Sequence, residues 1–100
     1  GIVKFDFKEL FERNLGSEDY ISIANNCNFI FIENLPDFNE DNSNQQQRFI
    51  TFIDIIYEKK IPLMITSNVN LDKINSAKSI KEPFKRTISR LYELTSMNYN

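Results

Sequence analysis

Residues 48–68, RFITFIDIIYEKKIPLMITSN, decide the fold of this chain. Their first part repeats apolar side chains every three or four positions, which is the period of an α-helix, and predicts a helix over residues 45–58. A second apolar run, IPLMI, follows directly and predicts a strand. The apolar face of the helix takes up more than half of its circumference and comprises Phe49, Ile50, Phe52, Ile53, Ile55, Ile56 and Tyr57.

The segment upstream supplies the strand that precedes this helix. Four consecutive apolar residues, FIFI at 29–32, are typical of a strand that is covered on both faces. A strand, a helix and a second strand favour parallel pairing with a right-handed crossover. Residues 2–7 alternate apolar and polar side chains and predict one further strand. The sequence therefore predicts an α/β fold, a single domain over residues 1–100 with a small, mostly parallel three-stranded sheet flanked by helices.

Two shorter helices are expected between the first two strands. Asp6 and Glu9 have the spacing of a capping box and predict a helix over residues 8–14. Gly16 suits the end of that helix, and Ser17 suits the cap of the next one. The apolar side of the second helix is formed by Tyr20, Ile23, Ala24 and Cys27.

The remaining segments are two polar connections and a closing helix. Residues 37–46 are rich in Asn and Gln without apolar periodicity, which predicts a flexible loop. Residues 69–82 are polar and irregular, with room for one helical turn. Pro83 suits the first turn of the last helix. The apolar stripe of that helix comprises Phe84, Thr87, Ile88, Leu91 and Leu94.

Arg86 and Arg90 lie four residues apart in this last helix. A helical wheel places both of them, with Glu93, opposite the apolar stripe, so we expect the two guanidinium groups to point away from the core. One interpretation is a solvated surface on which an Arg90–Glu93 pair stabilises the helix by roughly 0.2–0.5 kcal/mol. The other is a site that binds an anion or a partner.

Composition narrows the classes of function. The chain has no His, so it lacks the usual general base and the usual zinc ligand. Its 12 Lys and Arg against 14 Asp and Glu give a formal net charge of -2, which argues against a nucleic-acid partner. A single cysteine, Cys27, fits a reducing compartment, and no apolar run approaches the ~20 residues of a membrane span. The first residues enter a strand pattern without an initiator Met, as a fragment of a longer protein would.

Few residues are candidates for chemistry. Glu33 ends an apolar strand, as a magnesium-binding acid does in P-loop ATPases, but the chain lacks a G-x-x-x-x-G-K-[ST] loop, which favours a structural carboxylate. Ser67 has neither a His nor a G-x-S-x-G context. Cys27 is expected to be a small core residue. Asp54, at the edge of the apolar helix face, is expected to meet a basic residue of a neighbouring element, and Arg48 lies at the opposite edge.

Four segments, FKELFERNLGSEDYISIA, FIFIENLP, RFITFIDIIYEKKIPLMITSN and FKRTISRLYELTSMNY, occur in the order of a known family. Over about positions 3 to 99 they resemble the C-terminal part of the ZapE-type ATPases, AAA-type P-loop proteins of bacterial cell division and their mitochondrial relatives. The chain departs from the family at Gln47, where the family tends to have Arg, at Asn34, where it tends to be acidic, and at Ser67–Asn68. Its most specific pieces are Asp19–Tyr20, Arg48–Phe49–Ile50 with Asp54 and Tyr57, and Arg86 with Ser89–Arg90–Leu91, Glu93, Ser96 and Tyr99.

The resemblance implies a C-terminal subdomain of a larger P-loop ATPase, whose Walker motifs lie upstream. The parent protein would bind ATP with Mg²⁺ and hydrolyse it, whereas this chain alone would hold no cofactor and no metal. Arg86 and Arg90 become candidates for sensing the γ-phosphate, and the upstream core, other subunits and proteins of cell division or quality control become expected partners. The location implied is the bacterial cytoplasm, peripheral to the inner membrane, with mitochondria as the alternative. The alternative function is a free-standing α/β interaction module without a nucleotide role.

Overall fold

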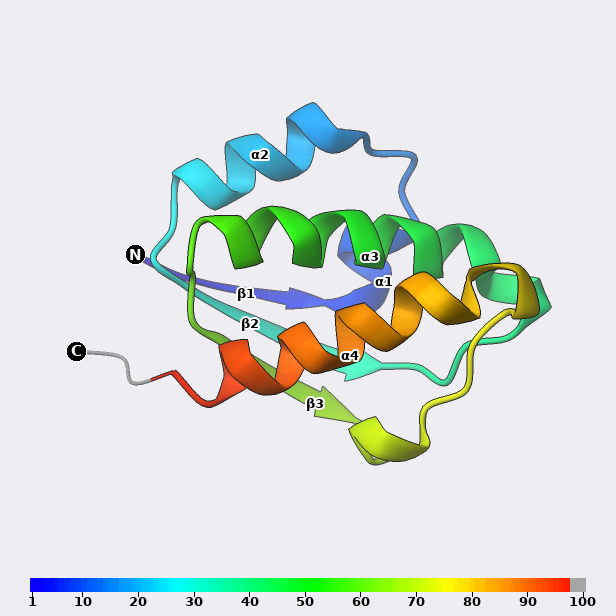
Figure 1. Cartoon of the computed structure of the whole chain (residues 1–100). Coiled ribbons are helices and arrows are strands. Elements are labelled where there is room, and N and C mark those ends of the chain that lie inside the picture. Colours follow the sequence, from blue (N-terminus) through cyan, green and yellow to red (C-terminus); the bar gives the residue numbers. More distant parts are fainter. Residues whose placement is uncertain (98–100) are drawn as a thin grey trace.

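The computed structural model describes residues 1–97 (Figure 1). It confirms the predicted α/β architecture. The sheet, predicted to be mostly parallel, is entirely parallel in the structure. The strands are β1 (Ile2–Asp6), β2 (Phe29–Leu35) and β3 (Leu63–Ser67), and the helices are α1 (Phe7–Phe11), α2 (Ser17–Asn25), α3 (Ser43–Glu58) and α4 (Lys81–Thr95). Three short 3₁₀ helices lie between them, η1 (Glu40–Asn42), η2 (Leu71–Lys73) and η3 (Lys78–Ile80).

The sheet has the strand order β1-β2-β3, so each strand pairs with its neighbour in the sequence. The register places Ile2 beside Phe29 and Ile30 beside Leu63. It is interrupted between Ile32 and Leu35 of β2, where the pairing with β3 shifts.

Asn34 occupies this irregularity in the left-handed region, with φ 63°. Its backbone N–H donates to Oγ1 of Thr66 at 3.0 Å, and its amide nitrogen Nδ2 donates to Oδ1 of Asp6 at 2.6 Å. Asn tolerates this backbone conformation better than most residues because its short polar side chain bonds locally. One residue thus links the carboxyl ends of all three strands, and the Asn34 amide lowers the pKa of the Asp6 carboxyl.

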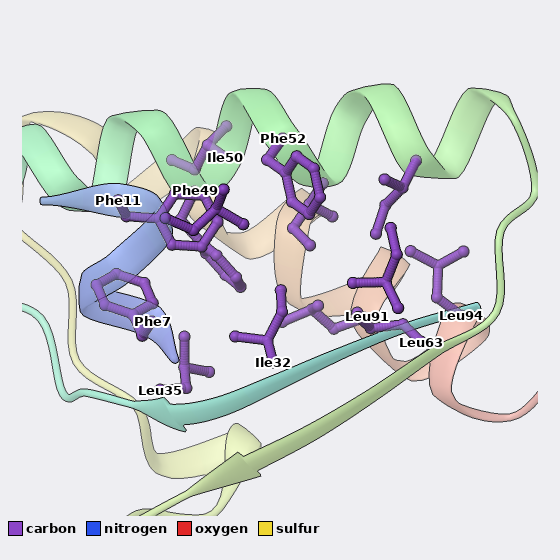
Figure 2. Close-up of a cluster of buried hydrophobic side chains, with 14 of the residues drawn as sticks. Phe7, Phe11, Ile32, Leu35, Phe49, Ile50, Phe52, Leu63, Leu91 and Leu94 are labelled. Carbon is purple, nitrogen blue, oxygen red and sulfur yellow. The ribbon is translucent and has the colours of Figure 1, made fainter. Parts of the chain in front are cut away.

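The helices lie on one face of the sheet, and α3 is the central one (Figure 1). It packs against the neighbouring helices α1, α2 and α4. Figure 2 shows apolar side chains of α3 pointing toward those of β2 and β3. Phe52 from α3, Leu91 from α4 and Ile32 from β2 lie in the space between the helices and the sheet (Figure 2). Aromatic rings extend this core toward α1, where the Phe11 and Phe49 ring centroids lie 5.4 Å apart at 88°. Such edge-to-face contacts add to the area buried.

The helices of residues 1–97 cover only one face of β2, which corrects the expectation of a strand buried on both sides. Ile30 and Ile32 face the helices and are fully buried, whereas Phe29 and Phe31 are only half-buried. The physical reason is that the helices described over residues 1–97 all lie on one face of the sheet (Figure 1), and the burial of Ile30 and Ile32 shows that these two side chains point to that face.

The helices before β2 differ in their ends from the sequence predictions. The capping box of Asp6 and Glu9 is confirmed, with the Asp6 N–H donating to Oε1 of Glu9 at 3.0 Å. However, α1 ends at Phe11, before residue 14. Gly16 caps the start of α2 instead of ending α1, because its N–H donates to Oδ2 of Asp19 at 2.9 Å.

The polar segment 37–46 holds more secondary structure than a loop. Residues 40–42 form η1, and α3 begins at Ser43, two residues before the predicted start. Gln46 is fully buried: its Nε2 donates to Oγ of Ser76 at 2.7 Å, and its Oε1 accepts the Ala77 N–H at 3.1 Å. Because a buried amide with both partners satisfied looks polar in the sequence, apolar periodicity cannot detect it.

The left-handed backbone of Asn34 can be tested with a matched pair of substitutions. Asn34→Ala and Asn34→Gly both remove the side-chain bond to Asp6, but only alanine has a Cβ that strains this conformation. We expect Asn34→Ala to have a free energy of unfolding about 1 kcal/mol below that of Asn34→Gly. Urea unfolding followed by circular dichroism measures both, and an alanine variant as stable as the glycine variant would contradict the assignment.

Candidate functional site

α4 carries both arginines that the sequence singles out, and its buried side is the predicted stripe. Phe84, Thr87, Leu91 and Leu94 are buried, and Ile88 packs against the core. The hydroxyl of Thr87 donates to the Pro83 carbonyl oxygen at 3.3 Å, which satisfies it within the helix. The helix is therefore held to α3 and β3 through its apolar face.

Arg90 does not point away from the core, so the prediction is wrong for this residue. Its Nη1 forms an ion pair with Oδ1 of Asp54 on α3, and its side chain is 22% exposed. Its guanidinium carbon also lies 4.6 Å from the centroid of the Tyr57 ring, a cation–π arrangement. Arg90 lies one turn before the buried Leu94, at the flank of the apolar stripe, where a long side chain reaches the neighbouring helix.

The expectation for Asp54 is confirmed, because it meets a basic residue of another element. Glu93, expected beside Arg90, interacts with the Tyr57 hydroxyl instead, and this hydrogen bond and the negative charge raise the pKa of Tyr57. Asp54 and Tyr57 of α3, with Arg90 and Glu93 of α4, together form what we call the interhelical cluster. The sequence placed Tyr57 on the apolar face and gave no sign of this polar contact.

Arg86 lies one turn before Arg90 and is exposed. Within residues 1–97 its guanidinium forms neither an ion pair nor a hydrogen bond. The structure therefore separates the two arginines. Arg90 belongs to the helix interface, and Arg86 presents a positive charge to the surroundings.

The carboxyl edge of the sheet carries polar side chains with structural partners. Glu33 forms an ion pair with Lys4, in which its Oε1 lies 2.9 Å from Nζ of the lysine. Ser67 donates its hydroxyl to the Leu35 carbonyl at 3.0 Å and accepts the Val69 N–H at 3.2 Å. These contacts agree with the structural interpretation of both residues. Over residues 1–97, no group of three or more Cys, Asp and Glu side chains is arranged to hold a metal ion.

Arg48 and Cys27 also have structural partners. Arg48 donates from Nη1 to the Phe11 carbonyl at 3.0 Å and from Nη2 to Oδ1 of Asn14 at 3.4 Å, which ties α3 to the end of α1. Cys27 donates its thiol to the Ile23 carbonyl, and burial raises the pKa of that thiol. A thiol with a raised pKa is a poor nucleophile at neutral pH, as expected of a core residue. None of the helices described over 1–97 is long and apolar enough to cross a membrane.

The described residues thus form an α/β subdomain in which an arginine-bearing helix is fixed to a parallel sheet. The sequence profile of the AFG1-like ATPases matches residues 1–100, so the chain belongs to the AFG1-like ATPase family. This membership confirms the resemblance to the ZapE-type ATPases.

Two relatives illustrate the range of the family. The chain is 33% identical over 73 residues to Lactation elevated protein 1 homolog B of Danio rerio, which is 73% of this chain and 14% of the relative. It is 28% identical over 81 residues to Cell division protein ZapE of Escherichia coli (strain K12), which is 81% of this chain and 22% of the relative. The chain therefore spans less than a quarter of the length of these curated relatives. No solved structure matches it significantly.

The Arg90–Asp54 pair can be tested by a double-mutant cycle. Arg90→Ala, Asp54→Ala and the double variant are expected to give a coupling free energy of about 1 kcal/mol, because the pair is partly buried and charge-assisted. Arg86→Ala is the control, and its free energy of unfolding should stay within about 0.5 kcal/mol of the parent chain, because Arg86 is exposed. Additive losses from the two single variants in urea unfolding would refute the pair.

The contact between Tyr57 and Glu93 can be tested by titration. Glu93→Gln removes the negative charge that raises the pKa of Tyr57, so this pKa should fall toward its ordinary value of about 10. Tyrosinate absorbance measures the titration, and subtracting the curve of a Tyr57→Phe variant isolates Tyr57 from the other tyrosines. An unchanged Tyr57 midpoint in Glu93→Gln would show that the two side chains do not interact.

Proposed function

We propose that this chain is the C-terminal subdomain of an ATP-hydrolysing AFG1-like ATPase. The family match over residues 1–100 supports a role inside such an enzyme. In this proposal an upstream core binds ATP with Mg²⁺, and the subdomain relays the nucleotide state to protein partners. The chain alone binds no nucleotide and hydrolyses none.

The observation that carries the proposal is the difference between the two arginines of α4. Arg90 is locked to Asp54 and Tyr57, which fixes the rotation of the helix on α3. Arg86, one turn earlier, is exposed and unpaired within the described chain. A free guanidinium on an immobilised helix suits an anion whose position is fixed, because little ordering is needed when it binds.

In this proposal Arg86 contacts the γ-phosphate of an ATP molecule. That ATP is bound by the core of the same polypeptide or by a neighbouring subunit. Arg90 acts as a positioning residue that holds α4 in place. An arginine that neutralises charge on the transferred phosphoryl group contributes on the order of 10³-fold or more in P-loop enzymes. Loss of a rate contribution of this size would distinguish Arg86 from an ordinary solvated side chain, whose removal leaves the rate of hydrolysis nearly unchanged.

The process served is proposed from the relatives. Cell division protein ZapE carries its process in its name, which favours cell division. A cytoplasmic location is proposed together with that process. Protein quality control and a mitochondrial location are the alternatives within the family. A free-standing interaction module is the second candidate function, and the exposed Ile2 and Met64 favour it, since large exposed apolar side chains often mark a protein interface.

The role of Arg86 is tested in the polypeptide encoded by the complete reading frame. Arg86→Ala is expected to lower kcat for ATP hydrolysis by about 100-fold or more with little change in thermal stability. Lys85→Ala is the matched control, because Lys85 is the preceding residue and, within residues 1–97, its ammonium pairs only with the exposed Glu82. Its kcat should stay near the parent value.

Several outcomes would count against the proposal. Turnover within threefold of the parent enzyme in Arg86→Ala would exclude a phosphate contact. A reading frame that encodes no G-x-x-x-x-G-K-[ST] loop would favour the free-standing module. Arg90→Ala is expected to lower both kcat and thermal stability, since it loosens α4. A loss of kcat with stability unchanged would instead assign the phosphate contact to Arg90.

A further inference from the structure

The sheet has a second face that the helices of residues 1–97 do not cover (Figure 1). Successive side chains of a strand point to opposite faces. Because Ile30 and Leu63 point into the helical layer and are buried, the residues that alternate with them point the other way. We call this surface the open face, and it comprises Ile2, Lys4, Phe31, Glu33 and Met64. Phe29 lies beside Ile2 and has a contact of its own, so it is not counted as part of the open face.

The open face is apolar along a diagonal and charged at one side. Lys4, Phe31 and Met64 form one row across the three strands, and Ile2 lies in the next. The exposed fraction is 67% for Ile2 and 49% for Met64. The Lys4 ammonium lies 5.8 Å from the centroid of the Phe31 ring and also pairs with Glu33, so a charged pair borders the apolar residues of this face.

An open apolar face is unusual for a sheet of this kind. Purely parallel sheets occur almost only with both faces covered, because their strands are apolar on both sides. The helices of residues 1–97 cover one face, and a cover for the other face would have to come from outside these residues. Family membership points to the source, because this chain corresponds to 14% and 22% of the length of two relatives.

The width of the face limits what can cover it. Three strands spaced about 4.8 Å apart span about 10 Å, and an α-helix with its side chains is about 10–12 Å across. A single helix laid along the strands matches this surface. Its apolar stripe would lie over Phe31 and Met64, with a polar edge near Lys4 and Glu33.

We propose that the open face docks one amphipathic helix from the ATPase core of the parent polypeptide. This inference rests on the proposed function only in assuming that such a core exists. It is independent of Arg86, which lies on α4 in the helical layer on the opposite side of the sheet (Figure 1). The sheet thus carries its own helices on one face and the core on the other.

Cysteine labelling tests this docking surface. Cys27→Ser removes the native thiol, and Met64→Cys or Ile2→Cys then introduces one on the open face. The rate of maleimide labelling is compared between the 100-residue chain and the polypeptide of the complete reading frame. We expect both sites to react at least tenfold more slowly in the longer polypeptide, with Glu18→Cys, an exposed site on α2, reacting at the same rate in both.

The outcomes separate the possible occupants. A cross-link from Met64→Cys to a helix of the core supports the proposal. Equal labelling rates overturn it, as does protection that appears in the 100-residue chain and rises with its concentration, which would indicate a second copy on this face. A cross-link only to a different protein overturns it as well. Because labelling does not require ATP turnover, these results stand whether or not Arg86→Ala lowers kcat.

Discussion

The packing of α3 between the sheet and the other helices is the constraint on which the rest of the structure depends. Its fully buried Phe49, Phe52, Ile53 and Ile56 fill the space over β2 and beside α1, α2 and α4. Each such side chain removes enough apolar surface from water to contribute about 2–3 kcal/mol. The same helix carries Gln46, Arg48 and Asp54, so the polar links that these three side chains make to neighbouring segments are positioned by this buried face.

The interhelical cluster fixes the relative orientation of α3 and α4, which their apolar contacts alone leave adjustable. Apolar contacts between α3 and α4 allow small rotations, since they are not directional. The Arg90–Asp54 pair and the Arg90 ring contact with Tyr57 restrict those rotations, because both have required geometries. The exposed charge of Arg86, one turn away, is consequently presented in a defined direction.

The sequence predicts the strands, α3, α4 and the parallel pairing because these follow from apolar periodicity. It fails where polar side chains take structural places. Gln46 is buried through an amide that bonds to Ser76 and Ala77, and Arg90 is drawn to α3 by a partner 36 positions earlier in the chain. A helical wheel describes one helix alone, so it cannot show that the flank of α4 meets Asp54. The open face also escapes prediction, since FIFI looks the same in a strand covered once or twice.

The order β1-β2-β3 has a consequence for the way the chain can be assembled. Each strand pairs with the one that precedes it in the sequence, so no strand has to be inserted between two that are already paired. During synthesis, which proceeds from the N-terminus, β1 provides an edge for β2, and β2 later provides one for β3. α4 follows all three strands in the sequence, so the helix that carries Arg86 and Arg90 is synthesised after every strand against which it can pack.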